Sequence, residues 1–102
     1  MKLSVVRGGG VSGIATRSEL SGESLSPDDA RTFRAKVEEA GLTTLRDDVP
    51  ARPEPDDLLY EVTVEDGGEA HTVHLTESTL PEPVRALIAW ADSRPSTEHG
   101  RA

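Results

Sequence analysis

Hydrophobic and polar residues alternate in four short stretches of the chain, a pattern typical of β-strands with one face covered. These stretches are residues 2–7, 14–20, 58–65 and 69–76. In the third, Tyr60, Val62 and Val64 alternate with polar neighbours, so the three side chains share the face expected to point to the core. Asp66-Gly67-Gly68 provides a turn before the fourth stretch. The pattern therefore predicts two β-hairpins.

Two other segments, residues 27–40 and 82–93, have apolar residues at the spacing of amphipathic helices. The apolar stripe comprises Ala30, Phe33, Val37 and Ala40 in the first and Val84, Leu87, Ile88 and Ala91 in the second, where Trp90 flanks it. Ser26 can cap the first helix, Pro27 suits its first position, and Gly41 can end it. Both helices are expected to dock on the core.

Together these elements predict an α+β fold in the order ββαββα. A four-stranded, largely antiparallel sheet from two β-hairpins has two helices on one face. Residues 1–94 form a single domain, because a chain of 102 residues can build one modest core. Residues 95–102 lack apolar anchors and are expected to be a disordered tail. The order of strands across the sheet is left open.

The first hairpin has a connector dense in glycine, Arg7-Gly8-Gly9-Gly10-Val11-Ser12-Gly13-Ile14. Glycine takes positive φ readily and leaves the backbone N–H and C=O groups uncovered. One interpretation is a simple turn or bulge. The other is a recognition surface, because about two residues suffice for a hairpin turn and Val11 would be exposed at the centre of a longer tip.

Residues 43–57 form a second unusual segment, without periodicity and with Pro50, Pro53 and Pro55. This is a long loop for a compact domain, and such loops are either functional or solvated connections. Leu45 and Val49 are the residues expected to hold it against the core.

Charge and composition narrow the classes of partner. The formal net charge of -8 opposes binding to nucleic acid or an anionic membrane surface. The chain has no cysteine, which excludes disulfides and thiolate metal sites. It also lacks an apolar run long enough to span a bilayer and the pattern of a signal peptide. We therefore expect a cytoplasmic protein that is monomeric when free.

The chain shows no motif of an enzyme. His71 and His74 are three residues apart in a predicted strand and would point to opposite faces, so they would not share a metal ion; one is expected to be partly buried and one exposed. The connector lacks the ending of a phosphate-binding loop, and Ser12 has no evident neighbouring base. We predict a protein without catalytic residues, metal or cofactor.

Three segments together resemble the emfourin family: the start of the chain through Gly13-Ile14, residues 60–68, and Leu80-Pro81-Glu82-Pro83-Val84-Arg85-Ala86-Leu87. Members of that family are small bacterial inhibitors of thermolysin-like (protealysin-type) zinc metallopeptidases. The resemblance covers most of residues 1–94 and none of the tail. Val11 stands where the family commonly has an aromatic residue, and Ser12 where it has alanine.

The resemblance implies that the chain binds a thermolysin-like zinc metallopeptidase and blocks its active-site cleft. The candidate peptidase-binding residues are Gly8, Gly9, Gly10, Val11, Ser12 and Gly13. The alternative is a non-enzymatic interaction or regulatory module that acts through the acidic, proline-rich loop 43–57.

Overall fold

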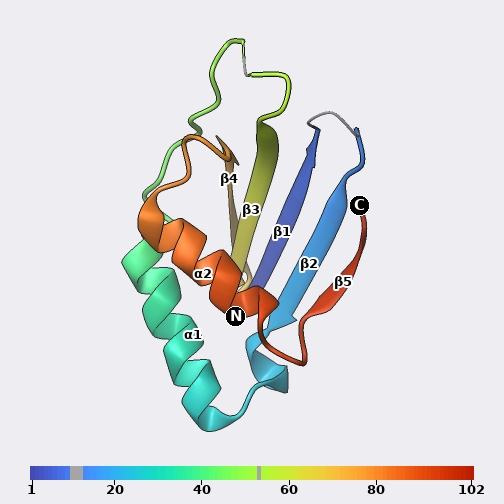
Figure 1. The fold of residues 1–102 in the computed structure, drawn as a ribbon. Helices are drawn as coiled ribbons and strands as arrows, with labels where there is room; N and C mark the ends of the chain where they lie inside the picture. The colour runs from blue at the N-terminus through green and yellow to red at the C-terminus, as the bar shows by residue number, and fades with distance from the viewer. Residues whose placement is uncertain (10–12, 53) are drawn as a thin grey trace.

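The computed structural model describes residues 1–9, 13–52 and 54–102 of the chain. In these residues the elements are β1 (Lys2–Gly9), β2 (Thr16–Ser21), the 3-10 helix η1 (Gly22–Ser24), α1 (Pro27–Ala40), β3 (Leu58–Asp66), β4 (Glu69–Thr76), α2 (Glu82–Asp92) and β5 (Glu98–Arg101) (Figure 1). The predicted α+β class and both helices are confirmed.

The strands form one antiparallel sheet in the order β4-β3-β1-β2-β5. Both predicted hairpins are present, and β1 joins them by pairing with β3 as well as with β2. Leu3 lies opposite Leu20 on one side and Val64 on the other, while Val5 lies opposite Val62. The inward-facing side chains of β1, β2 and β3 therefore lie opposite one another. A shift of one strand by one residue would turn its apolar side chains toward solvent.

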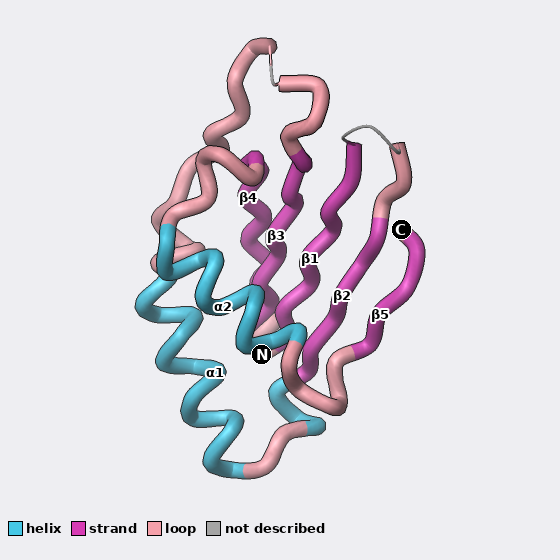
Figure 2. The backbone as a smooth tube through the Cα atoms, viewed as in Figure 1, coloured by secondary structure: helices cyan, strands magenta, loops and turns pink. Residues whose placement is uncertain are grey.

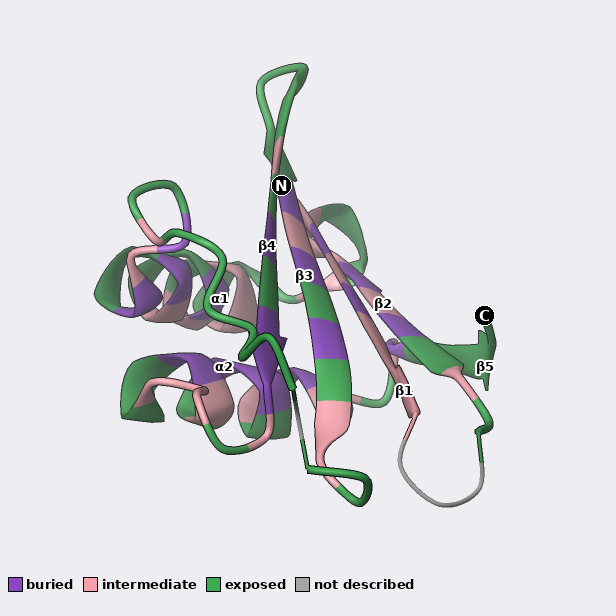
Figure 3. Cartoon of the chain, turned by 90° about the horizontal axis from the view of Figure 1, so that it is seen from above, coloured by how far each residue is buried: buried purple, intermediate pink, exposed green. Residues whose placement is uncertain are grey.

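Both α1 and α2 cover one face of the sheet, and no helix of the described residues lies on the other face (Figure 3). Phe33 of α1 stacks on Trp90 of α2 with ring centroids 6.0 Å apart. The most deeply buried apolar side chains come from every layer: Leu3, Val5, Leu20, Phe33, Leu42, Val62, Val73, Leu75, Val84 and Leu87. One core thus lies between the sheet and the helix pair, as the alternation predicted.

The ends of α1 match their sequence signals. The Ser26 side chain accepts a hydrogen bond from the Asp29 backbone N–H at 3.2 Å, and Pro27 occupies the first helical position. Gly41 takes the left-handed conformation, with φ of 62°, and donates its N–H to carbonyls of the last turn. These local contacts set the length of the helix independently of its packing.

The predicted strand count is wrong, because the segment expected to be disordered contains a fifth strand, β5. Its backbone pairs with β2, and the Ser18 hydroxyl lies 3.2 Å from Nδ1 of His99. Before β5, the Thr97 hydroxyl donates to the Ala91 carbonyl, and the Arg94 guanidinium lies 5.1 Å from the Trp90 ring centroid. Backbone pairing with a free strand edge needs no apolar side chains, so hydrophobic patterning could not reveal it.

The boundaries of the first hairpin also differ from the prediction. β1 continues through Gly8 and Gly9, whereas β2 begins only at Thr16. The reason is pairing with β3, where Gly8 and Gly9 lie opposite Leu59 and Leu58. No helix in the three described ranges is long and apolar enough to cross a bilayer.

Candidate functional site

The described flanks of the glycine connector require glycine for two different reasons. A Cβ on Gly8 would lie 2.9 Å from the Cβ of Ala15, so the two arms of the hairpin approach too closely for a side chain there. Gly9 and Gly13 have φ of 86° and 66°, which other residues rarely adopt. Gly10, Val11 and Ser12 lie outside the described residues. At Gly8, Gly9 and Gly13 the connector therefore presents backbone rather than side chains.

Arg7, the last residue before the glycines, ties this end of β1 to a helix. Its Nη2 donates a hydrogen bond to Oδ2 of Asp92 in α2 at 2.8 Å. The same guanidinium lies 5.6 Å from the centroid of the Tyr60 ring. β3 pairs with β1 along one edge, so the end of β1 that leads into the connector is held both by β3 and by α2.

Tyr60 continues this support into the segment after β4. Its hydroxyl donates to Oε2 of Glu77 at 2.7 Å, and Arg85 donates to Oε1 of Glu77 and to the Glu77 carbonyl, both at 2.8 Å. The Tyr60 hydrogen bond, followed by that of Arg85, lowers the pKa of the Glu77 carboxyl. Burial, and next the bond to Glu77, raises the pKa of the Tyr60 phenol. The carboxylate and the neutral phenol thus stabilise each other.

We expect Glu77→Gln to lose stability in a pH-dependent way. The pKa of Glu77 is below its ordinary value of 4.5 in the folded chain, so its contribution is present above that pH and disappears as the pH falls through the lowered value. The side chain is 42% exposed, and solvent screening should keep the loss at pH 7 below about 1 kcal/mol. Urea unfolding at pH 7 and pH 3 measures the difference, which should shrink at pH 3. An equal difference at both values would contradict this role.

The loop 43–57 is fastened along the edge of β4. Oδ1 of Asp47 accepts the His74 backbone N–H at 2.8 Å, and the Asp48 N–H donates to the His74 carbonyl at 2.9 Å. Further along, the Asp57 carboxylate accepts hydrogen bonds from the N–H and hydroxyl of Ser78. Leu45 packs against the core as expected, whereas Val49 is 41% exposed and does not. Part of an otherwise open strand edge is therefore covered.

The two strand histidines face opposite sides of the sheet, as predicted. His74 lies on the helix-free face, with Nδ1 3.1 Å from Asp47 and Nε2 3.5 Å from Glu61. Its backbone N–H is the main cause of the lowered pKa of Asp47. His71 is partly buried on the helix side, so the pair cannot bind one ion. In the described ranges, no three acidic, histidine or cysteine side chains gather as a metal site.

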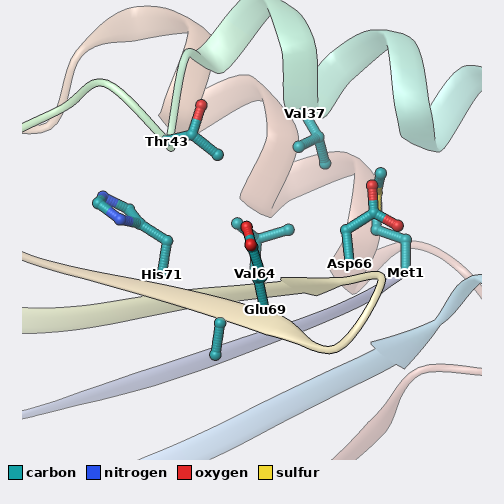
Figure 4. Close-up of a pocket in the computed structure, with 8 residues that line it drawn as sticks. Met1, Val37, Thr43, Val64, Asp66, Glu69 and His71 are labelled. Atoms are coloured by element: carbon teal, nitrogen blue, oxygen red, sulfur yellow. The ribbon is translucent and has the colours of Figure 1, made fainter.

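His71 borders a pocket of about 390 Å³ between α1 and the β3–β4 hairpin (Figure 4). Val37 and Thr43 line it on the helix side, and Asp66 lies near the turn. Nε2 of His71 is buried without a hydrogen-bond partner among the described residues. This pocket lies at the end of the sheet opposite the glycine connector, because Asp66 and Gly9 are at opposite ends of paired strands.

A second concave surface lies beside the connector, on the helix-free face. We call it the apolar groove; it has a volume of about 490 Å³ and its apolar lining includes Val6, Gly8, Ala15, Val49 and Leu59. Glu61 and His74 form its polar border. Strand alternation could have indicated part of it, since Val6 and Leu59 are apolar at outward positions. The position of Val49 in the groove could not be predicted from the pattern, because it depends on the hydrogen bonds that fasten the loop to β4.

Comparison with models of protein families identifies the family of this chain. The model of the emfourin family matches residues 5–92, which include the connector, the loop 43–57, the second hairpin, both helices and all of the first hairpin except the start of β1. The chain belongs to the emfourin family. β5 lies beyond the emfourin match. Searches of curated proteins and of solved structures found no match.

Membership of the emfourin family is consistent with an inhibitor of metallopeptidases rather than an enzyme, and it suggests a peptidase as partner. Of the predicted contact residues, Gly8 and Gly9 end β1, and Gly13 lies two residues before Ala15, which faces Gly8. The arms of this hairpin end at one end of the sheet (Figure 2). The loop 43–57 extends from the same end of the sheet (Figure 2).

Proposed function

We propose that the chain is a protein inhibitor of a thermolysin-like (protealysin-type) zinc metallopeptidase, and that it blocks the active-site cleft with a surface that includes residues 8–13. The observation that carries this proposal is the backbone of the connector's flanks, where Ala15 leaves no room for a side chain on Gly8 and where Gly9 and Gly13 have positive φ. Membership of the emfourin family supports the choice of target.

The physical argument begins with the cleft of such a peptidase. It binds extended backbone, and its catalytic zinc keeps one coordination position open. A tip with few side chains can enter where a covered loop would collide with the walls. Val11 is our candidate for the apolar anchor, Gly9, Gly10 and Gly13 for main-chain hydrogen bonds, and Ser12 for an auxiliary contact. The inhibitor itself needs no catalytic residue or cofactor for this action.

The direct test is titration of a fixed amount of a thermolysin-like peptidase with the purified chain. Thermolysin and a peptidase of the protealysin type serve as probes, with a short peptide as substrate. We expect reversible loss of hydrolysis that saturates at one inhibitor per enzyme, because one cleft accepts one tip. Full activity of both enzymes at a large excess of inhibitor would contradict the proposal.

A second candidate function is a non-inhibitory interaction module that acts through the loop 43–57. The hydrogen bonds of Asp47, Asp48 and Asp57 favour it, because they fasten an acidic loop to the segment 74–78 at two places. Affinity capture from a bacterial lysate separates the candidates. A thermolysin-like peptidase as the captured protein supports inhibition, and a different protein supports the interaction module.

A further inference from the structure

The exposed large apolar side chains of the described residues gather at one end of the molecule. They are Ile14, Val49 and Leu59, with exposed fractions of 53%, 41% and 44%. Leu59 lies opposite Gly8 in the β1–β3 pairing, and Val49 lines the same groove from the loop. Ile14 is the last residue of the connector. Isolated exposed apolar residues need no explanation, but Val49 and Leu59 line one groove together, and such a pair indicates a contact surface.

The apolar groove is continuous with the proposed inhibitory surface. Gly8 belongs to both, since it lines the groove and begins the run of contact glycines. Ala15 closes the groove on the other arm of the hairpin, where it touches the position that a Gly8 side chain would take. A partner that covers Gly8 and Ala15 from the helix-free side therefore also contacts the groove.

The polar border of the groove indicates the charge of the partner. Glu61 and Asp47 flank His74 from two sides, with contacts of 3.5 and 3.1 Å to its ring nitrogens. The loop that carries Val49 also contains more acidic than basic residues. An apolar surface with an acidic border fits an apolar protrusion that has a cationic side chain beside it.

We infer that the apolar groove is a second contact surface for the inhibited peptidase, which places an apolar side chain from the rim of its cleft between Leu59 and Val49. This inference rests on the proposed inhibitory function. The connector then blocks the cleft, and the groove contributes affinity and selects among peptidases by the shape and charge of the rim. It also gives the loop 43–57 a role in the same interface, through Val49.

Charged substitutions in the groove test the inference. Leu59→Glu and Val49→Glu each place a carboxylate where an apolar side chain should be enclosed, so we expect inhibition to weaken by about 30-fold or more. Thr72→Glu is the matched control: it adds the same charge on the helix-free face of β4, farther from the connector, and should change inhibition by less than about 3-fold. Val49 lies outside helices and strands, so its variant should fold even if Leu59→Glu does not.

The outcomes separate the two proposals. If the parent chain inhibits and both groove variants inhibit equally well, the groove is not a contact, although the inhibitory function stands. If the parent chain inhibits no thermolysin-like peptidase, the inhibitory function fails and the inference is overturned with it. The groove could instead be covered by a second copy of this chain, which sedimentation equilibrium tests. If the parent chain is a dimer and Leu59→Glu is a monomer, the groove belongs to a dimer interface and the inference is overturned.

Discussion

Val11→Asp should weaken inhibition of a thermolysin-like peptidase by several kcal/mol, which is about 100-fold or more in the inhibition constant. The reason is the chemistry of the proposed contact: a carboxylate placed in an apolar pocket loses water and gains no partner. Val11→Ala should cost only about 1 to 2 kcal/mol, because it removes two methyl groups and adds no charge. Inhibition constants for both variants against the same enzyme measure the effect.

Ala35→Asp provides a control for the effect of charge alone. Ala35 is exposed on α1, so the variant adds the same negative charge on the helix layer, away from the connector, and should inhibit like the parent. Circular dichroism should be unchanged in all three variants. The opposite pattern would assign the contact elsewhere: if Val11→Asp inhibits normally while substitutions in residues 43–57 abolish inhibition, the loop takes the place of the connector.

Phe33→Ala should lower the free energy of unfolding by about 3 to 5 kcal/mol. Phe33 is almost completely buried, packs between the sheet and α2, and stacks on Trp90. Its removal leaves a cavity that the surrounding layers cannot fill. Domains of this size have total stabilities of about 5 to 15 kcal/mol, so the loss is a large fraction of the total. Urea unfolding monitored by circular dichroism measures it.

Arg34→Ala is the matched control on the next residue of α1. Arg34 is exposed and its ion pair with Asp66, at 3.4 Å, is also exposed, so the change should stay within about 0.5 kcal/mol. A loss below about 1 kcal/mol in Phe33→Ala would mean that the two helices are not held to the sheet through this residue.

Local pattern was sufficient for most of the elements. The helix α1 begins and ends where Ser26 and Gly41 indicated, because caps satisfy backbone groups within a few residues. The inward positions of β3 follow from strict alternation, and Trp90 flanks the stripe of α2 as predicted. These features depend on neighbours in the sequence, so one chain read by itself contains the necessary information.

The candidate site could be predicted only in part. The run of glycines indicated backbone freedom in the connector, and Gly8, Gly9 and Gly13 each have a close approach or a positive φ that requires glycine. That residues 10–12 belong to a peptidase contact remains a prediction. The apolar groove was not predicted, because it combines Leu59 of β3 with Ala15 before β2 and Val49 of the loop. Their proximity arises from pairings between distant segments.

Hydrophobic period and capping signals act over a few residues, so they specify the two hairpins, the two helices and their apolar faces. The central place of β1, the pairing of β5 with β2 and the fastening of the loop 43–57 to β4 arise from contacts between distant segments. Such contacts leave no local pattern, because a strand edge offers the same backbone donors and acceptors to any segment. Which segment pairs there depends on how the whole chain packs, so β5 forms although it has no apolar anchors of its own.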